Sequence, residues 1–509
     1  MVFLVWYDDG WYISEGLVNV FPAFIAALLA CGSLLVGTEW QAFVGSFYYP
    51  DLSVIPIGIP SYTEGEPIST STAPISIAIT PDGTKVLTAN AIGGDIAVLD
   101  LTASPIAAYT VSIPFALTVL SVAITPDGTR ALVGYQSSQA PSETNCFVTF
   151  LDLTVTPITV SPSAIALPSV GTGMAITPDG TMALIGASDR NNPVISVLDL
   201  TTTPISVLSN FVTGVFSGGV AITPDGTKAL AAMTSLSTVT ILDLTAKPCP
   251  AQILTLGVGQ QPFDVAITPD GTKALVTCLG GDSVLSPPGI TVLDLTTTPI
   301  SVQTPLLPLS QAPSFLAITP DSSKAMVSVG GAAQAGPIRL SASGPGEVVA
   351  FDLTTVPISE IATSPFYMEV PLAIAITPDQ APTARFTVRC HGKKATFDAS
   401  ASSSPVGSIQ KYRWHFGDGG KMTTTSPIVE HTYHSLYRED SGKSVVAKLT
   451  VTNTAGTSKR ITFTGRTVSN HGGPSAVCKH SVVRHSRGVR HQAAKRGPLS
   501  PPALLTAAQ

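Results

Sequence analysis

The sequence predicts an all-β protein, a seven-bladed β-propeller followed by an immunoglobulin-like β-sandwich. Only 12% of the 509 residues are charged, the chain contains 43 Gly and 42 Pro, and one short motif recurs every 45–58 residues. Exposed helix faces normally carry many Lys and Glu, so this low charge disfavours a helical bundle. Frequent turns between short apolar runs favour many short strands.

The recurring unit has the pattern of one propeller blade. The sequence Ala-Ile-Thr-Pro-Asp begins at residues 78, 123, 175, 221, 266, 317 and 375. A second motif, (Leu/Phe)-Asp-Leu, has its Asp at residues 100, 152, 199, 243, 294 and 352. Pro-Asp-Gly is typical of a type I turn, and the apolar alternation around it is typical of strands. Each unit therefore predicts four antiparallel strands, A to D, as in a blade.

The variation in unit length lies between strands B and C. The distance from the (Leu/Phe)-Asp-Leu Asp to the next Ala-Ile-Thr-Pro-Asp is always 22 or 23 residues. All B–C connections of a propeller leave the same face, and insertions on one face of a repeat array often mark a binding face. The long connections are 136–146, 279–289 and 330–347. Ligand-binding candidates in the variable connections are Asp189, Arg190, Asn191, Asp282 and Glu347.

The seventh unit is completed by the N-terminal part of the chain. Its Ala-Ile-Thr-Pro-Asp motif is not followed by strands B, C and D, whereas residues 41–45 match residues 130–134 of a complete unit. We therefore expect a propeller over residues 38–380 in which N-terminal strands close the last blade. Seven blades are predicted, with six as the alternative.

The unit resembles the YVTN-type propeller repeats of bacterial surface-layer and secreted proteins. These repeats are named after the sequence of one strand, and that strand corresponds here to Ala42-Phe43-Val44-Gly45 and Ala274-Leu275-Val276-Thr277. The resemblance implies export and placement in the bacterial cell envelope, at the cell surface or outside the cell. It implies no single ligand.

A second set of motifs predicts the β-sandwich. Phe397-Asp398-Ala399-Ser400, then residues 412–419, His431-Thr432-Tyr433 and residues 449–453 follow one another in the order of a PKD domain. The resemblance covers residues 381–470 and implies a spacer, or a module that contacts carbohydrate or protein. The structural residues are expected to be Trp414 and Phe416, which should point into the core because they alternate, and the turn Gly417, Asp418 and Gly419.

The two ends of the chain differ in charge. Residues 1–37 form a hydrophobic export or anchor segment, and membrane contact is expected only there, through a lipid on Cys31 or a membrane span. Residues 1–380 have a net charge of −20 and residues 381–509 one of +14. The tail, residues 471–509, has six basic residues, four His and no acid, so it is expected to be disordered and able to contact an anionic surface. Specific nucleic-acid binding is not expected.

The sequence gives little support for catalysis. Residues 1–380 contain no His, and 13 of their Asp lie in the two repeated motifs, where turn and strand-end roles account for them. Asp264 has no such role. His431 and His434 are interpreted as loop or strand-edge residues rather than a metal pair. The sequence therefore predicts that the chain is not an enzyme and has no catalytic residue, cofactor or metal.

The function predicted from the sequence is that of a non-catalytic cell-surface or secreted binding or adhesion protein. The B–C face of the propeller would contact a protein or glycan, and the sandwich would act as a spacer or second contact. One alternative is a lactonase-like or hydrolase-like enzyme that uses carboxylates in the central channel. The other is a purely structural protein of the cell envelope.

Overall fold

The computed structural model of the chain describes residues 5–7, 10–12 and most of residues 40–482. Within that stretch the positions outside the description are 47–50, 58–66, 71, 92, 138–145, 187–193, 203, 213–216, 247–250, 256–260, 281–286, 331–333, 336–337, 340–345, 366–370, 379–381, 383, 392–393, 405–407, 434–444, 454–456, 464–467 and 472–475. Most of the predicted export segment and everything beyond Val482 also lie outside it. In the described part of the chain, no helix is long and apolar enough to cross a membrane.

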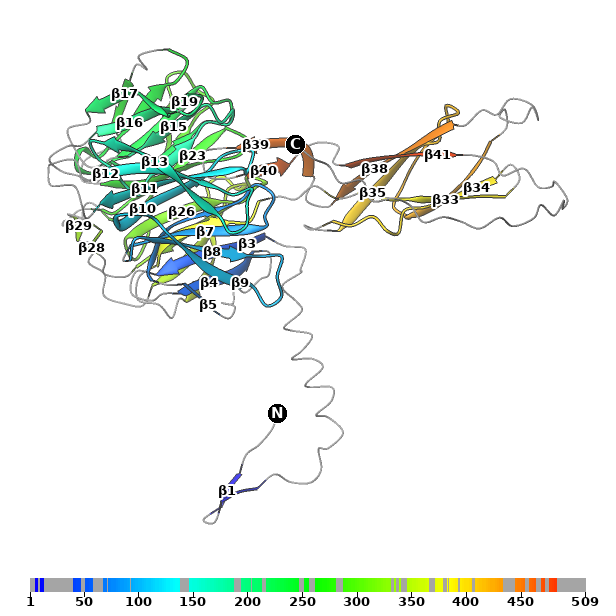
Figure 1. Ribbon diagram of the computed structural model, residues 1–509, viewed down its shortest axis with the longest axis horizontal. Helices are drawn as coiled ribbons and strands as arrows, with labels where there is room; N and C mark the ends of the chain where they lie inside the picture. The colour runs from blue at the N-terminus through cyan, green and yellow to red at the C-terminus, as the bar shows by residue number, and fades with distance from the viewer. Residues whose placement is uncertain are drawn as a thin grey trace, which may run out of the picture.

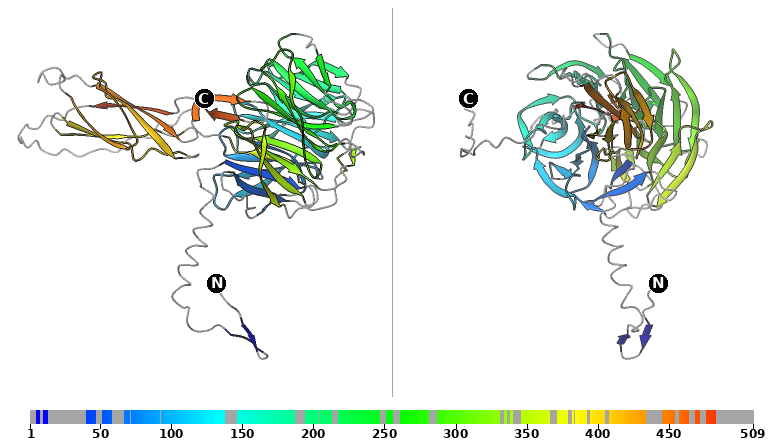
Figure 2. Two further views of the ribbon diagram at one scale, coloured as in Figure 1. Left: turned by 180° about the vertical axis from the view of Figure 1, so that it is seen from behind. Right: turned by 90° about the vertical axis from the view of Figure 1, so that its right-hand side faces the viewer.

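The described residues from 40 to 376 form seven four-stranded antiparallel sheets, many of whose strands are labelled in Figure 1. The right-hand view of Figure 2 shows the sheets arranged as a ring. Sheet 1 is β6 (Pro74–Ile79), β7 (Lys85–Asn90), β8 (Asp95–Asp100) and β9 (Ala107–Ser112). Sheet 2 is β10 (Ala116–Ile124), β11 (Arg130–Ser137), β12 (Cys146–Asp152) and β13 (Thr159–Leu167). Sheet 3 is β14 (Met174–Ile176), β15 (Met182–Ile185), β16 (Val194–Asp199) and β17 (Ser206–Val212).

The remaining propeller sheets follow the same order of strands. Sheet 4 is β18 (Ser217–Ile222), β19 (Lys228–Met233), β20 (Thr238–Asp243) and β21 (Ala251–Thr255), with the 3₁₀ turn η1 (Thr234–Leu236). Sheet 5 is β22 (Pro262–Ile267), β23 (Lys273–Cys278), β24 (Gly289–Asp294) and β25 (Ser301–Pro308). Sheet 6 is β26 (Pro313–Ile318), β27 (Lys324–Val329), β30 (Glu347–Asp352) and β31 (Ser359–Pro365), with the small hairpin β28 (Gln334–Ala335) and β29 (Ile338–Arg339).

Sheet 7 joins the two ends of the propeller region. It consists of β32 (Pro371–Ile376), β3 (Trp40–Ser46), β4 (Asp51–Ile57) and β5 (Ile68–Ser69), in that order. Ala42 pairs with Ile376, and the Thr377 N–H donates to the Gln41 carbonyl at 2.9 Å. The A strand of each sheet contacts that of the next, and β32 contacts β6, so the ring closes with the edges of the A strands around its centre.

The sheets pack on one another through small aliphatic side chains. Between sheets 1 and 2, for example, Leu87, Val98, Val133 and Leu151 are fully buried. The other sheet interfaces have similar clusters of Ala, Val, Leu and Ile. Each such side chain contributes about 1.5–3 kcal/mol when it leaves water, so the stability of the ring is divided among many comparable contacts.

The direction of the strands gives the ring two different faces. The A–B turns, such as residues 80–84, and the C–D turns, such as residues 100–106, lie on one face, called here the turn face. The B–C and D–A connections lie on the opposite face, called the loop face. Because β32 ends at Ile376 on the turn face and β3 begins at Trp40 on the same face, both ends of the propeller leave from there.

The C-terminal region is a two-layer sandwich. One sheet contains β33 (Thr387–His391), β34 (Lys394–Asp398) and β37 (Ile428–Thr432), and the other contains β36 (Lys421–Thr424), β35 (Ile409–His415), β38 (Val445–Asn453) and β41 (Ala476–Val482). Two smaller pairs of strands lie outside these sheets. They are β39 (Thr457–Phe463) with β40 (Val468–His471), and β1 (Val5–Tyr7) with β2 (Gly10–Tyr12) near the N-terminus.

The core of the sandwich is a single aromatic cluster. Trp414 is 0% and Phe416 1% exposed, whereas their neighbour Arg413 on β35 points outward. The ring of Phe386 lies edge-on to Trp414 at 5.2 Å, and that of Phe397 lies 5.0 Å from Phe416. The all-β fold class predicted from the sequence is therefore confirmed, and its sandwich core contains the expected aromatic residues.

The tail differs from the expectation over one segment. Residues 476–482, which the charge pattern places in a disordered tail, form β41 and pair antiparallel with β38 from Val445↔Val482 to Val451↔Ala476. The segment contains Lys479 and His480 and has no clear alternation. The open edge of β38 supplies the backbone partners that the local sequence does not predict.

Candidate functional site

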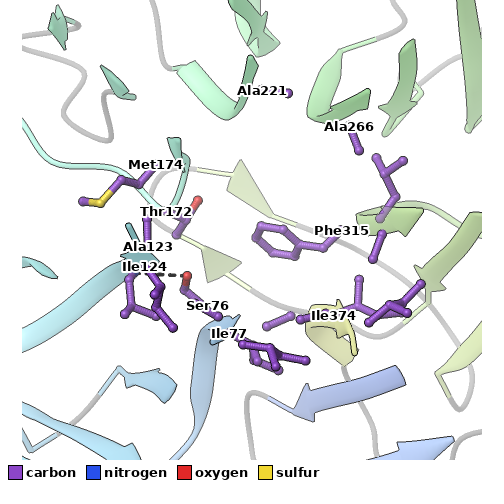
Figure 3. Close-up of a pocket in the computed structure, with 18 of the residues that line it drawn as sticks. Ser76, Ile77, Ala123, Ile124, Thr172, Met174, Ala221, Ala266, Phe315 and Ile374 are labelled. Atoms are coloured by element: carbon purple, nitrogen blue, oxygen red, sulfur yellow. Dashed lines mark hydrogen bonds between the residues drawn. The ribbon is translucent and has the colours of Figure 1, made fainter. Parts of the chain in front are cut away.

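The central channel contains a small cavity of about 60 Å³. Figure 3 shows the A strands that line it, and the labelled side chains are mostly small or aliphatic. They include Ser76, Ala123, Met174, Ala221, Ala266 and Ile374. None of the described residues that line this cavity has an ionisable side chain. The cavity itself therefore offers no general acid or base.

The loop-face end of the channel is filled by apolar side chains. Ile75, Phe263 and Phe315 begin or lie early in their A strands, and they form one buried cluster with Leu120 and Ile374 around it. The rings of Phe263 and Phe315 meet edge to face, with centroids 5.3 Å apart. A polar ligand approaching this end therefore meets an apolar plug rather than an open funnel.

Asp264 is a fully buried carboxylate beside this plug. Its Oδ2 accepts a hydrogen bond from the Leu316 N–H of the next sheet at 3.2 Å. Sheets 1 and 2 are linked in the same way, because the Val122 N–H donates to Ser76 Oγ at 3.3 Å. Ser76 and Asp264 occupy the same position in their repeats, two residues before the motif Ala. We therefore interpret Asp264 first as a link between β22 and β26.

The Asp residues of the repeated motifs are held in turns. Asp100 Oδ1 accepts hydrogen bonds from the backbone N–H of Thr102 at 2.9 Å and from its hydroxyl at 2.6 Å, and these bonds lower the pKa of Asp100. For Asp82, burial acts to raise the pKa, but hydrogen bonds from Thr80 and Thr84 outweigh it and the net pKa is lowered. These carboxylates stay ionised and stabilise the turn face.

Most of the predicted ligand-binding residues cannot be placed. Asp189, Arg190, Asn191 and Asp282 lie outside the described residues. Glu347 lies at the start of β30, half-buried and opposite Val329. Among the residues that the structure describes, no group of three or more His, Cys, Asp or Glu side chains could hold a metal ion.

The two histidines noted in the sequence do not form a described pair. His434 lies outside the described residues, whereas His431 Nε2 lies 2.7 Å from Asp418 Oδ2. The ring of His431 stacks on Phe416 at 3.9 Å. Burial acts to raise the pKa of Asp418, but the hydrogen bond with His431 outweighs it and the pKa is lowered. His431 thus holds the Gly417–Gly419 turn against the sandwich core.

The described thiols of the propeller, Cys146 and Cys278, are buried. Burial raises the pKa of Cys278 to about 11. A thiol with such a pKa carries almost no thiolate near neutral pH, so Cys278 is unsuited to nucleophilic chemistry.

A larger concavity, which no sequence motif predicted, lies on sheet 2. It is a groove of about 510 Å³ whose lining includes Phe115, Tyr135, Phe147 and Thr149. The signal that the sequence did contain is the pair Pro114-Phe115, in a connection where a turn residue such as Gly is usual.

Comparison with known proteins identifies the sandwich. Residues 379–468 match the PKD domain family. This region is a PKD domain. It covers less than a fifth of the chain. No curated protein matches the sequence.

Solved structures match the propeller region. A periplasmic gluconolactonase of Pseudomonas aeruginosa, PpgL, is 12% identical with a TM-score of 0.51, over 66% of this chain and 99% of that one. A proposed 6-phosphogluconolactonase of Bacteroides uniformis is 14% identical with a TM-score of 0.51, over 67% of this chain and 100% of that one. A protein of unknown function from Desulfotomaculum acetoxidans is 16% identical with a TM-score of 0.49, over 66% and 98% of the two chains. At this identity the likeness concerns the fold alone, which is propeller-like, and the comparisons do not show the YVTN repeats.

These comparisons correct the prediction that the chain is not an enzyme. Solved structures of similar fold include a gluconolactonase, so a fold of this kind occurs in a hydrolase. The prediction relied on the lack of His in residues 1–380 and on the absence of sequence motifs from other catalytic folds. A propeller brings together residues that are far apart in the chain, and no local motif records such a site.

Proposed function

We propose that the chain is a surface or secreted recognition protein. In this proposal the loop face contacts a saccharide or a protein, and the PKD domain acts as a spacer or second contact. The observation that carries the proposal is the contrast between the two faces of the ring. In sheets 1 to 6 the turn face repeats the same hydrogen-bonded turns, whereas the loop face has B–C connections of variable length.

The uniform turn face supports an architectural role for that side. In each sheet from 1 to 6, a Thr-Pro-Asp turn and an Asp-Leu-Thr turn repeat the same hydrogen bonds, as at Asp127 with Thr129 and at Asp152 with Thr154. Uniform turns leave little room for specific recognition. Variable connections on a fixed scaffold are where binding sites usually occur.

The attachment of the chain supports recognition on the loop face. Trp40 and Ile376 both lie at the turn face, so the N-terminal segment and the PKD domain join the ring there. Export by residues 1–37 and contact of the basic tail with an anionic surface belong to the same proposal. In that arrangement the loop face stays clear of both attachments.

A binding experiment on the full chain without residues 1–37 tests this function. The protein is applied to an array of immobilised glycans and used to capture surface proteins, which are then identified. In a variant, residues 138–145, 281–286 and 331–346 are shortened to the length of the β19–β20 connection, and Thr102→Ala on the turn face is the matched control. We expect the shortened variant to lose binding and the control to keep it. Equal binding by the shortened variant, or no binding by the unaltered chain, contradicts the proposal.

Hydrolysis of a gluconolactone is a second candidate function. It is supported by the likeness of the fold to PpgL and to the Bacteroides uniformis protein. Asp264 is the described carboxylate next to the channel plug. Release of acid from glucono-δ-lactone and 6-phosphogluconolactone, compared between the unaltered chain and Asp264→Asn, tests it. A rate equal to the uncatalysed rate for both substrates rejects this candidate.

A further inference from the structure

The groove on sheet 2 exists because sheet 2 extends beyond its neighbour. β10 and β13 each have nine residues, whereas β6 and β9 have six. The face of sheet 2 that packs against sheet 1 is therefore left uncovered toward the loop face. The uncovered part is the groove of about 510 Å³, within the roughly 300–1,000 Å³ usual for small-ligand sites.

Aromatic rings form much of the groove wall. Tyr135 on β11 pairs directly with Phe147 on β12, and their rings stack with centroids 5.7 Å apart. Tyr135 is almost fully buried, whereas Phe147 is half-buried and faces the groove. Phe115 lies at the rim and is 62% exposed.

Phe115 is held in a backbone conformation that normally belongs to glycine. The Ala116 N–H donates to the Ile113 carbonyl at 3.1 Å, with Pro114 second in the turn and Phe115 third at φ +63°. A positive φ at the third position is the type II turn, which prefers Gly there. A bulky residue in this region costs about 1–3 kcal/mol of backbone strain, and strain of this kind is concentrated at functional sites.

The same turn is fixed from the neighbouring sheet. The Ile113 N–H donates to the Gly94 carbonyl at 2.9 Å, and a Cβ on Gly94 would overlap the Ala116 carbonyl oxygen. The exposed ring of Phe115 is thus presented from a rigid support. A rigid exposed aromatic ring binds with little loss of conformational entropy.

The lining of the groove is uncharged and carries hydroxyl groups. Ser137, Thr149 and Ser161 line it together with the aromatic rings, and none of its lining residues is acidic or basic. An uncharged lining is complementary to a neutral ligand. A charged ligand would lose its hydration in this groove without gaining an ionic partner. Sugar rings present an apolar face, which the aromatic rings match, and a rim of hydroxyls, which the half-buried Ser161 hydroxyl can contact.

We propose that this groove binds a neutral oligosaccharide, with one sugar ring stacked on Phe115. The proposal rests on the proposed function and assigns its saccharide contact to sheet 2. A peptide that docks by strand addition needs main-chain hydrogen-bond partners. At the bulge of β13 the Ser161 and Ser163 carbonyls lie 3.2 Å from Thr149 Oγ1, which already occupies them. The groove floor therefore offers aromatic rings rather than peptide-like pairing.

The test compares three single variants of the full chain without residues 1–37. Phe115→Gly removes the ring and relieves the backbone strain, so it should fold at least as stably as the unaltered chain. Phe147→Leu keeps apolar volume but removes the second ring. Leu117→Ala is the matched control, because Leu117 is 58% exposed and next to the turn but does not line the groove. Thermal unfolding confirms that each variant folds.

The probes are neutral di- and trisaccharides of glucose, mannose, galactose and N-acetylglucosamine, with a proline decapeptide as the competing class. We expect at least one sugar to bind, about tenfold weaker binding by Phe115→Gly, a smaller loss with Phe147→Leu, and no change with Leu117→Ala. If Phe115→Gly binds the sugar as tightly as the unaltered chain, the groove is not the binding site. The proposed function still stands in that case if the variant with shortened connections no longer binds the sugar. Binding of the decapeptide alone, or of no probe, overturns the saccharide assignment.

Discussion

The propeller and the PKD domain distribute their stability in opposite ways. The ring is held by many small aliphatic contacts, with one cluster at each sheet interface, and its repeated turns use the same hydrogen bonds. The sandwich depends on one cluster of large rings around Trp414. A repeated interface tolerates the loss of one member because its neighbours remain, whereas a single core does not. The difference predicts which changes act locally and which unfold a whole unit.

The largest effect is expected from Trp414→Ala. Removal of a fully buried Trp typically costs about 3–5 kcal/mol, a large part of the stability of a small domain. Calorimetry should then show a PKD transition at much lower temperature and an unchanged propeller transition. Met422→Ala, on the neighbouring strand and 40% exposed, is the control and should change neither transition. A joint shift of both transitions would mean that the two units do not unfold independently.

The next effect is expected from Gly218→Ala in the propeller. A Cβ at this position would overlap the Phe263 carbonyl of sheet 5, and a backbone atom cannot move aside cheaply. We expect a loss of about 1–3 kcal/mol in the propeller transition alone. Val356→Ala, at a 90% exposed position, is the control. If Gly218→Ala does not lower the temperature of the propeller transition, the close approach of sheets 4 and 5 is not required for the stability of the propeller.

Acid should weaken the propeller more than the sandwich. Hydrogen bonds lower the pKa of Asp100, Asp152 and Asp294, whose stabilisation is present above the unfolded pKa of about 3.8 and is lost as the pH falls through the lower folded pKa. More such residues lie in the described propeller than in the described sandwich, where Asp398 and Asp418 behave alike. Thermal scans from pH 6 to pH 2.5 measure the two transitions. An equal decline of both would contradict the comparison.

The smallest effect on stability is expected from the loss of one side-chain hydrogen bond in a single turn. Thr102→Ala removes the hydroxyl that donates to Asp100 at an exposed turn, which should cost about 0.5 kcal/mol. The same change at Thr354, combined with the first, should add without coupling because the turns are in different sheets. Denaturant unfolding of the single and double variants measures this. A cooperative loss would show that the turns stabilise one another around the ring.

Local patterns account for most of the fold that the sequence predicts. The Thr-Pro-Asp turns need only residues within five positions of one another, as in the bond between Thr80 and Lys85. The match of residues 41–45 to 130–134 likewise anticipates the strand that pairs with β32. The alternation of Trp414 and Phe416 is enough to place both rings in the sandwich core.

The features that the sequence did not predict depend on contacts between distant residues. Asp264 bonds to Leu316, which is 52 residues away and in another sheet. The groove arises from the lengths of strands in two neighbouring sheets, and no single segment contains that information. Phe115 is a turn residue only because Pro114 and Gly94 fix its backbone. The ligand-binding candidates in the variable connections, apart from Glu347, lie outside the described residues.

The exit of both chain ends from the turn face has a geometric consequence for copies of this protein held on one surface. Each copy would direct its loop face outward, so the loop faces of neighbours would be parallel and could not meet one another. Recognition between the loop faces of two copies would then require two opposing surfaces. Several outward loop faces on one surface would instead engage a repeating partner together, and their combined binding would exceed that of any single face.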